Sequence, residues 1–273
     1  MAPPAGWRPE LVALDIDGTI CAEGGDPLLS HTTITPRVRA ALTAMLSSGV
    51  HTVLCTGRPV LSVLPFLGEL ELPAGIAICS NGAVWIDAAT GEIVHHTMFD
   101  PAEPVAVLRE LLPGAVFTAE EPGIGDRSTG RTAERPEVSS TERVVDFGEL
   151  VATPTTRLTV HWPGRTGADL AAALASTPMP WLQCVISLDG PWLVATAPGV
   201  TKASALEKLR ISLDVPADRT LAVGDGVNDL EMLAWAAHGV AMGHAPETVR
   251  AAADEVCRSV SEDGLAELLT RWF

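Results

Sequence analysis

The first eighty residues alternate between short apolar runs and longer segments in which apolar residues recur every three or four positions. A continuous apolar run bounded by turn residues is typical of a strand buried on both faces of a parallel sheet. Three such runs occur, at 11–15, 50–55 and 76–80. The segments between them, at about 35–48 and 59–70, have helical periodicity. This alternation of strand and helix predicts a parallel sheet covered by helices.

The segment at about 35–48 also carries the signals that begin and end a helix. Thr35 is the predicted N-cap, Pro36 occupies the first helical position and Gly49 marks the end. We therefore expect a helix that packs one face on the sheet. That face is formed by Val38, Leu42, Met45 and Leu46.

The pattern changes after Asn81 and Gly82, and the strand–helix alternation resumes only at about residue 201. The segments between are predicted as follows: strands at 83–86 and 92–98 forming a hairpin, a helix at 104–112, a strand at 115–120, a polar loop at 121–140, a strand at 156–162, a helix at 167–176, and strands at 181–188 and 192–196. Strand pairs separated by helices favour an inserted α+β domain with an antiparallel sheet. The chain has 273 residues, which also exceeds the roughly 100–200 residues of a typical domain.

Two carboxylates, Asp15 and Asp17, end the first apolar run in the sequence LVALDIDGTI. In open α/β sheets ligands bind beyond the carboxyl ends of the strands, where these side chains would lie. Two acids so close repel each other unless a cation or a shared proton relieves them. The alternative is an ordinary turn or helix cap, in which Asp and Gly are common.

The second strand ends in Thr56 and Gly57. A hydroxyl followed by turn N–H groups suits an anionic oxygen, although a strand-to-helix turn capped by Thr56 is the simpler interpretation of this segment alone. Lys202 begins a predicted helix, where a cation opposes the helix dipole; this placement indicates either a function or a solvated lysine.

The segment LAVGDGVNDLEML at 221–233 is a further strand that runs into a turn. Asp225, Asn228 and Asp229 occupy that turn. Hard oxygen ligands suit Mg²⁺, which keeps several waters and needs only one or two protein carboxylates plus a substrate phosphate. This turn therefore indicates a magnesium site.

Together the four segments resemble the haloacid dehalogenase superfamily of aspartate-nucleophile phosphohydrolases. The match is DIDGT, a Thr at a strand end, a Lys, and then GDxxND, in this order. SNGA at 80–83, followed by a long insertion, is similar to the Cof-type branch, which carries a large α/β cap. The resemblance implies a Rossmann-like parallel-sheet core at 1–82 and 197–273 with an inserted α+β cap at 83–196. The motifs leave about 85–195 matched only in length and general pattern.

The resemblance also implies a role for each matched residue. Asp15 would attack phosphorus and form an aspartyl-phosphate, and Asp17 would protonate the leaving oxygen and later deprotonate water. Asp15, the backbone carbonyl of Asp17, and Asp225 with Asp229 would hold Mg²⁺, Asp229 directly or through water. Thr56, Gly57, Lys202 and Asn228 would bind the phosphoryl group or orient the groups that do. The presence of Asp17 argues against the dehalogenase branch, and DIDGT in place of DKTGT argues against a transport ATPase.

Composition excludes some partners. A net charge of −16 opposes binding to a nucleic-acid backbone. The N-terminal residues carry no visible export signal, and the charge-free stretch at 40–57 contains too many polar residues for a membrane span. Five scattered cysteines without a CxxC motif predict reduced thiols. We therefore expect a cytoplasmic protein, monomeric or weakly self-associating, with no nucleic-acid or membrane partner.

Several other side chains are weaker candidates for a functional role. Arg58 either orients the phosphate loop or is a surface or ion-paired arginine, and Asn81 either faces the site or forms a type I′ turn with Gly82. His95 and His96 are adjacent and would point to opposite faces of a strand, so we do not expect a shared metal. Packing is the favoured role for three tryptophans of the insertion: Trp162, Trp181 and Trp192.

Three arginines, Arg127, Arg131 and Arg135, lie in the predicted polar loop. A solvated loop is the simpler interpretation, but a loop that folds over the site would let Arg127 and Arg131 contact the substrate. The overall expectation is a Mg²⁺-dependent phosphatase of a small phosphorylated metabolite such as a sugar phosphate. The alternatives are a dedicated biosynthetic sugar-phosphate phosphatase, a phosphomutase of the same superfamily, or a catalytically idle binding protein.

Overall fold

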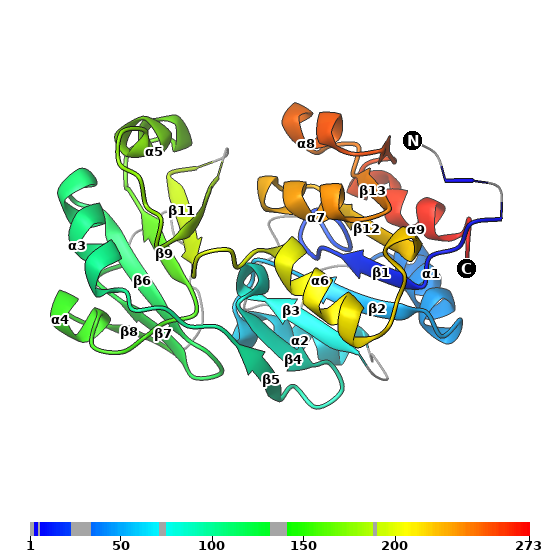
Figure 1. The fold of residues 1–273 in the computed structure, drawn as a ribbon, viewed down its shortest axis with the longest axis horizontal. Helices are drawn as coiled ribbons and strands as arrows, with labels where there is room; N and C mark the ends of the chain where they lie inside the picture. The colour runs from blue at the N-terminus through cyan, green and yellow to red at the C-terminus, as the bar shows by residue number, and fades with distance from the viewer. Residues whose placement is uncertain (1–2, 5, 23–33, 71–74, 132–140, 188–189) are drawn as a thin grey trace.

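The structure, a computed structural model, describes residues 3–4, 6–22, 34–70, 75–131, 141–187 and 190–273. Two sheets build the molecule, and Figure 1 shows them side by side, with both termini in the part that contains the larger sheet. The chain enters the part with the smaller sheet once, after β5, and returns once, before α6, as an inserted domain does. The predicted combination of an α/β core and an inserted α+β domain is confirmed.

The larger sheet has the strand order β14-β13-β12-β1-β2-β3-β4-β5. Its strands are β1 (Leu11–Leu14), β2 (His51–Cys55), β3 (Ile76–Cys79), β4 (Val84–Asp87), β5 (Ile93–His96), β12 (Thr220–Gly224), β13 (His238–Ala241) and β14 (Glu255–Val256). Its helices are α1 (Pro36–Ser47), α2 (Val60–Leu70), α6 (Lys202–Ser212), α7 (Leu230–Trp235), α8 (Glu247–Ala252) and α9 (Gly264–Leu269). The six strands from β14 to β3 run parallel, which places the carboxyl ends of β1, β2 and β12 at one edge.

Helices cover both faces of this sheet, and alternate residues of β1 show why the strand is apolar throughout. Val12 and Leu14 pack in one core cluster with residues of α1, α2 and α9. Leu11 and Ala13 pack in a second cluster with residues of α6, α7 and α8. The strand is therefore buried on both faces, as a central parallel strand must be.

The predicted helix at 35–48 forms as α1. The Thr35 hydroxyl accepts a hydrogen bond from the backbone N–H of Val38 at 3.2 Å, and Pro36 stands at the first position. Gly49 follows the helix with φ of +80°, a conformation that a residue with a Cβ rarely adopts. The local signals thus set both ends of α1.

The hairpin of β4 and β5 departs from the prediction that 83–98 belongs to the inserted domain. β4 pairs antiparallel with β3, and β5 pairs with β4, so both strands extend the larger sheet. The reversal occurs at Asn81 and Gly82, which have φ of 54° and 108° and are closed by a hydrogen bond from Ala83 N–H to Ser80 C=O. This tight turn returns the chain along β3, which keeps the hairpin beside the strand that precedes it.

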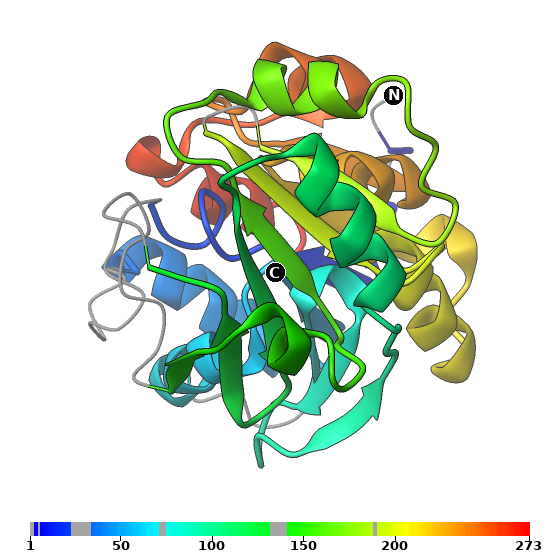
Figure 2. The same ribbon diagram turned by 90° about the vertical axis from the view of Figure 1, so that its left-hand side faces the viewer.

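The smaller sheet, which we call the cap sheet, has the order β10-β11-β9-β6-β7-β8. Its strands are β6 (Val116–Glu121), β7 (Gly125–Ser128), β8 (Glu142–Val144), β9 (Leu158–His161), β10 (Gln183–Ile186) and β11 (Trp192–Thr196), and its helices are α3 (Ala102–Leu111), α4 (Phe147–Leu150) and α5 (Gly167–Leu174). All neighbours pair antiparallel except β7 and β8, which are parallel. The helices cover the face of the sheet that points away from the core, as Figures 1 and 2 show. The opposite face is turned toward the core.

The strand β7 corrects the predicted polar loop at 121–140, of which 132–140 lies outside the described residues. Residues Gly125–Ser128 are buried and pair with β6. Their sequence, Gly-Asp-Arg-Ser, contains no apolar residue, so the hydrophobic pattern carried no sign of a strand. This segment forms a strand because its backbone pairs with β6, although its residue types do not favour a strand.

Candidate active site

The predicted motif residues lie together at the carboxyl ends of the parallel strands. Asp15 follows β1, Thr56 follows β2, and Asp225 follows β12, which pairs directly with β1. Lys202 opens α6, where the Thr201 hydroxyl caps the helix by accepting a hydrogen bond from Ser204 N–H. The strand order therefore brings together residues from the two ends of the chain.

Lys202 joins two of the acids. Its Nζ donates to Asp15 Oδ1 at 2.7 Å and to Asp229 Oδ1 at 2.6 Å, and the lysine is 1% exposed. Burial lowers the pKa of Lys202, but the two carboxylates more than offset this and hold that pKa above its usual range. The alternative of a solvated lysine is therefore wrong, and the unfavourable position at the start of a helix is compensated by the two acids.

Burial and the neighbouring Asp229 carboxylate raise the pKa of Asp15 well above its usual range, while Lys202 acts in the opposite direction. Asp15 is 5% exposed and Asp225 is 6% exposed. Such crowding of buried acids is costly unless positive charge is present. Lys202 supplies one such charge, and a bound cation would supply more.

The turn after β12 is organised around Asp229. Its Oδ2 accepts hydrogen bonds from the backbone N–H groups of Asp225 and Gly226, both at 2.9 Å, while its Oδ1 accepts from Lys202. Both oxygens of Asp229 thus already have partners, so this side chain holds Lys202 and the turn that presents Asp225.

A metal ion fits these residues. Carboxylate oxygens of Asp15, Asp225 and Asp229 lie within 4.8 Å of one another. Gly18 has φ of +73°, and a Cβ at this position would lie 2.0 Å from Asp225 Oδ2. The glycine therefore lets the DIDG turn approach Asp225. An all-oxygen set with negative charge is the kind of site that Mg²⁺ prefers.

Asp17 is held by Arg58. The guanidinium donates from Nε to Asp17 Oδ2 at 2.7 Å and from Nη2 to Oδ1 at 2.5 Å. The Arg58 backbone N–H in turn donates to the Thr56 hydroxyl at 3.1 Å. Of the two roles considered for Arg58, pairing with an acid is confirmed, and the acid belongs to the site.

Asn228 and Asn81 form a polar pair beside Gly57. Asn228 Nδ2 donates to Asn81 Oδ1 at 3.0 Å, and a Cβ at Gly57 would lie 3.1 Å from that same Asn81 oxygen. Both alternatives for Asn81 hold, because the residue adopts the left-handed turn conformation and also lines the cavity.

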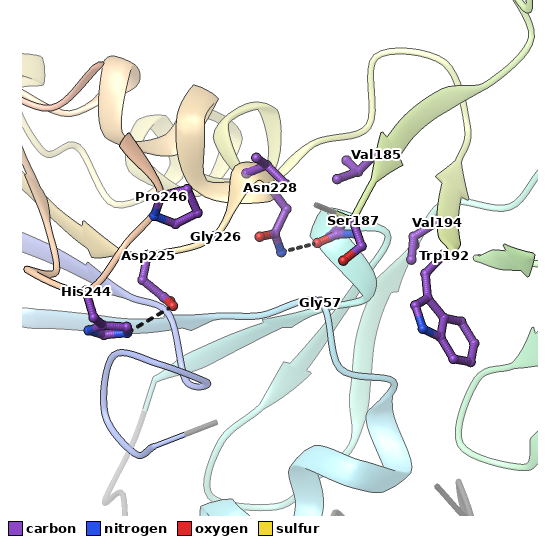
Figure 3. Close-up of a pocket in the computed structure, with 12 residues that line it drawn as sticks. Gly57, Val185, Ser187, Trp192, Val194, Asp225, Gly226, Asn228, His244 and Pro246 are labelled. Atoms are coloured by element: carbon purple, nitrogen blue, oxygen red, sulfur yellow. Dashed lines mark hydrogen bonds and ion pairs between the residues drawn. The ribbon is translucent and has the colours of Figure 1, made fainter. Parts of the chain in front are cut away.

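A cavity of about 570 Å³ lies between the core and the cap sheet (Figure 3). Its core side includes Gly57, Asn81, Asp225, Asn228 and His244. His244 Nε2 lies 3.4 Å from Asp225 Oδ2, and partial burial lowers the pKa of this histidine. His244 was not predicted, although it follows β13 at the same edge of the sheet, and that position was the available signal.

The cap side of the cavity includes Val185, Ser187, Trp192 and Val194, from β10, β11 and the residue after β10. Packing was the favoured role for Trp192, so its position in the cavity departs from that expectation. Trp162 and Trp181, by contrast, pack against the cap's hydrophobic cluster, as predicted.

The sequence interpretation missed a buried contact between cap and core. Glu120 of β6 is 2% exposed; it accepts from the Ser80 hydroxyl at 2.6 Å and from Val60 N–H, at the start of α2, at 3.3 Å. Arg157 of the cap lies 3.5 Å from Glu120 and donates to the Gly57 carbonyl at 3.1 Å. Phe117 and Ala119 lie on one face of β6 and pack in the cap's hydrophobic cluster. Because side chains alternate along a strand, Glu120 lies on the opposite face, toward the core, and this pattern was the available signal.

The expectation that Arg127 reaches the substrate is wrong. Arg127 is 2% exposed, lies 3.2 Å from Glu121, and donates to the backbone carbonyls of Glu149 and Thr153. Arg127 follows Asp126 on β7, and its contacts hold it within the cap. Arg131 is exposed, and Arg135 lies outside the described residues.

Other expectations concern the whole chain. His95 and His96 are consecutive residues of β5, and neither belongs to the group of possible metal ligands found among the described residues. All five cysteines are unpaired, as predicted. In the part of the chain that the structure describes, no helix is both long and apolar enough to cross a membrane.

Comparison with known proteins gives the family. Residues 12–115 and 156–269 match the family of haloacid dehalogenase-like hydrolases. The chain is 26% identical to a 5-amino-6-(5-phospho-D-ribitylamino)uracil phosphatase of Bacillus subtilis, over 97% of this chain and 98% of the relative. It is similar in fold to a haloacid dehalogenase-like hydrolase from B. subtilis, with a TM-score of 0.81, 24% identity, and 97% and 100% of the two chains covered. A subclass IIB sugar phosphatase of the superfamily gives a TM-score of 0.77 and 24% identity, with 96% and 98% covered. Because the family match spans most of the chain, this protein belongs to the haloacid dehalogenase-like hydrolases and is an enzyme that hydrolyses phosphoric monoesters.

Proposed function

We propose that this protein is a cytoplasmic, Mg²⁺-dependent phosphatase that hydrolyses a small phosphorylated metabolite through an aspartyl-phosphate on Asp15. The observation that carries the proposal is the buried contact of Lys202 with Asp15 and Asp229, beside Asp225 and next to the cavity. An idle binding protein would not need this costly group of charges.

In the first step Asp15 attacks phosphorus, an Asp15–phosphorus bond forms, and the bond from phosphorus to the leaving oxygen breaks. Asp17 gives its proton to that oxygen. In the second step water attacks phosphorus, Asp17 takes the water's proton, and Asp15 is released. Because Arg58 binds both oxygens of Asp17 here, the proton transfers require one of these hydrogen bonds to be exchanged for the substrate oxygen or the water.

The other motif residues position charge for these steps. Asp15, the Asp17 carbonyl and Asp225 would hold Mg²⁺, together with Asp229, which would bind it directly or through water. A bound ion would supply positive charge that neutralises the transferring phosphoryl oxygens. Lys202 and Thr56 would bind the same phosphoryl oxygens. Asn228 and Gly57 line the space that the phosphoryl group would enter.

We also propose a division of labour between the two parts of the chain. The core comprises 1–82 and 197–273 together with the β4–β5 hairpin, and it performs the chemistry. The remainder of 83–196 forms the cap, which selects the leaving group. One B. subtilis relative is named as a phosphatase of a ribitylaminouracil phosphate. This supports the alternative of a phosphatase dedicated to one metabolite.

The test is hydrolysis of p-nitrophenyl phosphate by the wild type and by Asp15→Asn. We expect the wild type to be active with Mg²⁺, inactive in excess chelator and restored by Mg²⁺, but poorly by Ca²⁺, because its looser coordination misplaces the nucleophile. Asp15→Asn should remove nearly all turnover while its circular dichroism remains that of the wild type. A variant that retains a tenth of the wild-type rate would exclude the aspartyl-phosphate mechanism.

A further inference from the structure

The cap side of the cavity has a chemical character different from that of the core side. β10 and β11 pair antiparallel with Val185 opposite Val194. Because side chains alternate along a strand, Val185 and Ser187 share one face with Trp192 and Val194. These four are the cap residues among the described lining of the cavity. The alternate residues Leu193 and Ala195 pack into the cap's own core.

This cap wall is mostly apolar. It consists of two valines, one indole and one hydroxyl, and among the described lining residues it contains no Lys, Arg, Asp or Glu. Pro246 adds an apolar group at the core side, near His244 (Figure 3). The polar lining groups Asn81, Asn228 and Asp225 belong to the core, where the phosphoryl group is processed.

Trp192 is held in place as a flat surface. Its ring stacks on His161, with ring centroids 4.0 Å apart and an interplanar angle of 17°. His161 is 1% exposed, and the two residues are cross-strand partners of β9 and β11. His161 thus occupies one face of the indole, and the ring also lines the cavity, where a ligand could contact it. An aromatic ring fixed in this way loses little entropy when a ligand packs on it.

We propose that the cap wall is a subsite for a planar aromatic or heterocyclic leaving group, and that polyhydroxylated sugar phosphates are disfavoured. This inference rests on the proposed phosphatase function. A sugar ring carries several hydroxyl groups, and each one buried against valine without a partner loses its hydrogen bonds to water. A flat ring has no such cost and gains contact with the indole face. A second phosphate on the leaving group would also find no cation among the described residues of this wall.

The test compares primary phosphate esters that differ only in their ring. Benzyl phosphate, cyclohexylmethyl phosphate and glucose 6-phosphate each place a six-membered ring one carbon from the ester oxygen, and acetyl phosphate lacks a ring. With Mg²⁺ present, we expect kcat/KM for benzyl phosphate to exceed that for glucose 6-phosphate by about tenfold or more. The cyclohexylmethyl ester should fall between them, because it is apolar but not flat.

Variants of Trp192 assign the preference to the cap wall. Trp192→Ala should lower kcat/KM for benzyl phosphate by about tenfold and change that for acetyl phosphate by less than about twofold. Trp192→Phe should retain most of the benzyl activity. The matched control is Trp162→Ala, which removes a cap indole that packs outside the cavity and donates to the Pro113 carbonyl. It should leave the ranking of substrates unchanged.

The outcomes separate the two proposals. If no ester is hydrolysed in the presence of Mg²⁺, the proposed function fails. If the esters are hydrolysed but glucose 6-phosphate equals or exceeds benzyl phosphate, the subsite is refuted while the phosphatase stands. An equal loss of activity toward benzyl phosphate and acetyl phosphate in Trp192→Ala would also refute the subsite. The wild-type ranking decides the matter even where Trp192→Ala fails to fold.

Discussion

At the scale of single residues, Lys202 lies between two carboxylates that would otherwise face each other in a buried space. Lys202→Met should therefore abolish activity and lower the free energy of unfolding by about 3 kcal/mol, because removal of one partner leaves buried charge uncompensated. Urea denaturation in the presence of chelator measures this change. Lys208→Met is the control, since Lys208 is exposed on the same helix, α6. Equal stability of the two variants would contradict the structural role of Lys202.

At the scale of elements, β6 connects the cap to the loops that we propose bind phosphate. Glu120→Gln replaces a charged acceptor that Ser80, Val60 N–H and Arg157 share. We expect a loss of about 3 kcal/mol in the free energy of unfolding, because Arg157 loses its buried counter-charge. The value of kcat/KM should fall by a similar factor for every substrate, since the loop at Gly57 is common to all of them.

The control for this prediction is Glu110→Gln, an exposed position on α3 of the cap. We expect this control to have the thermal stability of the wild type and the wild-type kcat/KM with both acetyl phosphate and benzyl phosphate. A change in substrate ranking in Glu120→Gln, rather than a uniform loss, would show that Glu120 acts on the leaving group and not on the phosphate loop.

At the scale of the whole molecule, the acids that would hold the metal come from distant parts of the chain but from adjacent strands, β1 and β12. A ligand that binds only the folded state raises stability, by about 2.7 kcal/mol at 100 times its Kd. We expect Mg²⁺ to raise the Tm of the wild type and to leave that of Asp225→Asn nearly unchanged. The exposed Asp218→Asn should respond as the wild type does. An equal rise in Asp225→Asn would exclude Asp225 as a ligand.

The sequence alone predicted the parallel strands of the core but not that the β4–β5 hairpin extends its sheet. Its strands are continuous apolar runs because both faces are buried, and α1 begins at Thr35 and Pro36 because capping is a local interaction. The meeting of the motif acids could be predicted because they follow strands whose carboxyl ends share one edge of the sheet. These features depend on local preference and on a topology that the order of elements nearly dictates.

Tertiary structure decided what depends on contacts between distant segments. Arg127 looked like a loop residue because β7 has no apolar pattern, and its burial follows from pairing with β6. Glu120, Arg157 and Trp192 acquire their positions at the cavity and at the contact with the core only when the cap sheet meets the core. For Glu120 the alternation with Phe117 and Ala119 indicated the face of the strand but not the partner, and nothing in the sequence around Arg157 and Trp192 distinguishes them from surface or packing residues. The motif residues of the candidate active site thus follow from local patterns, whereas the residues on the cap side of the cavity depend on which face of the cap sheet is turned toward the core.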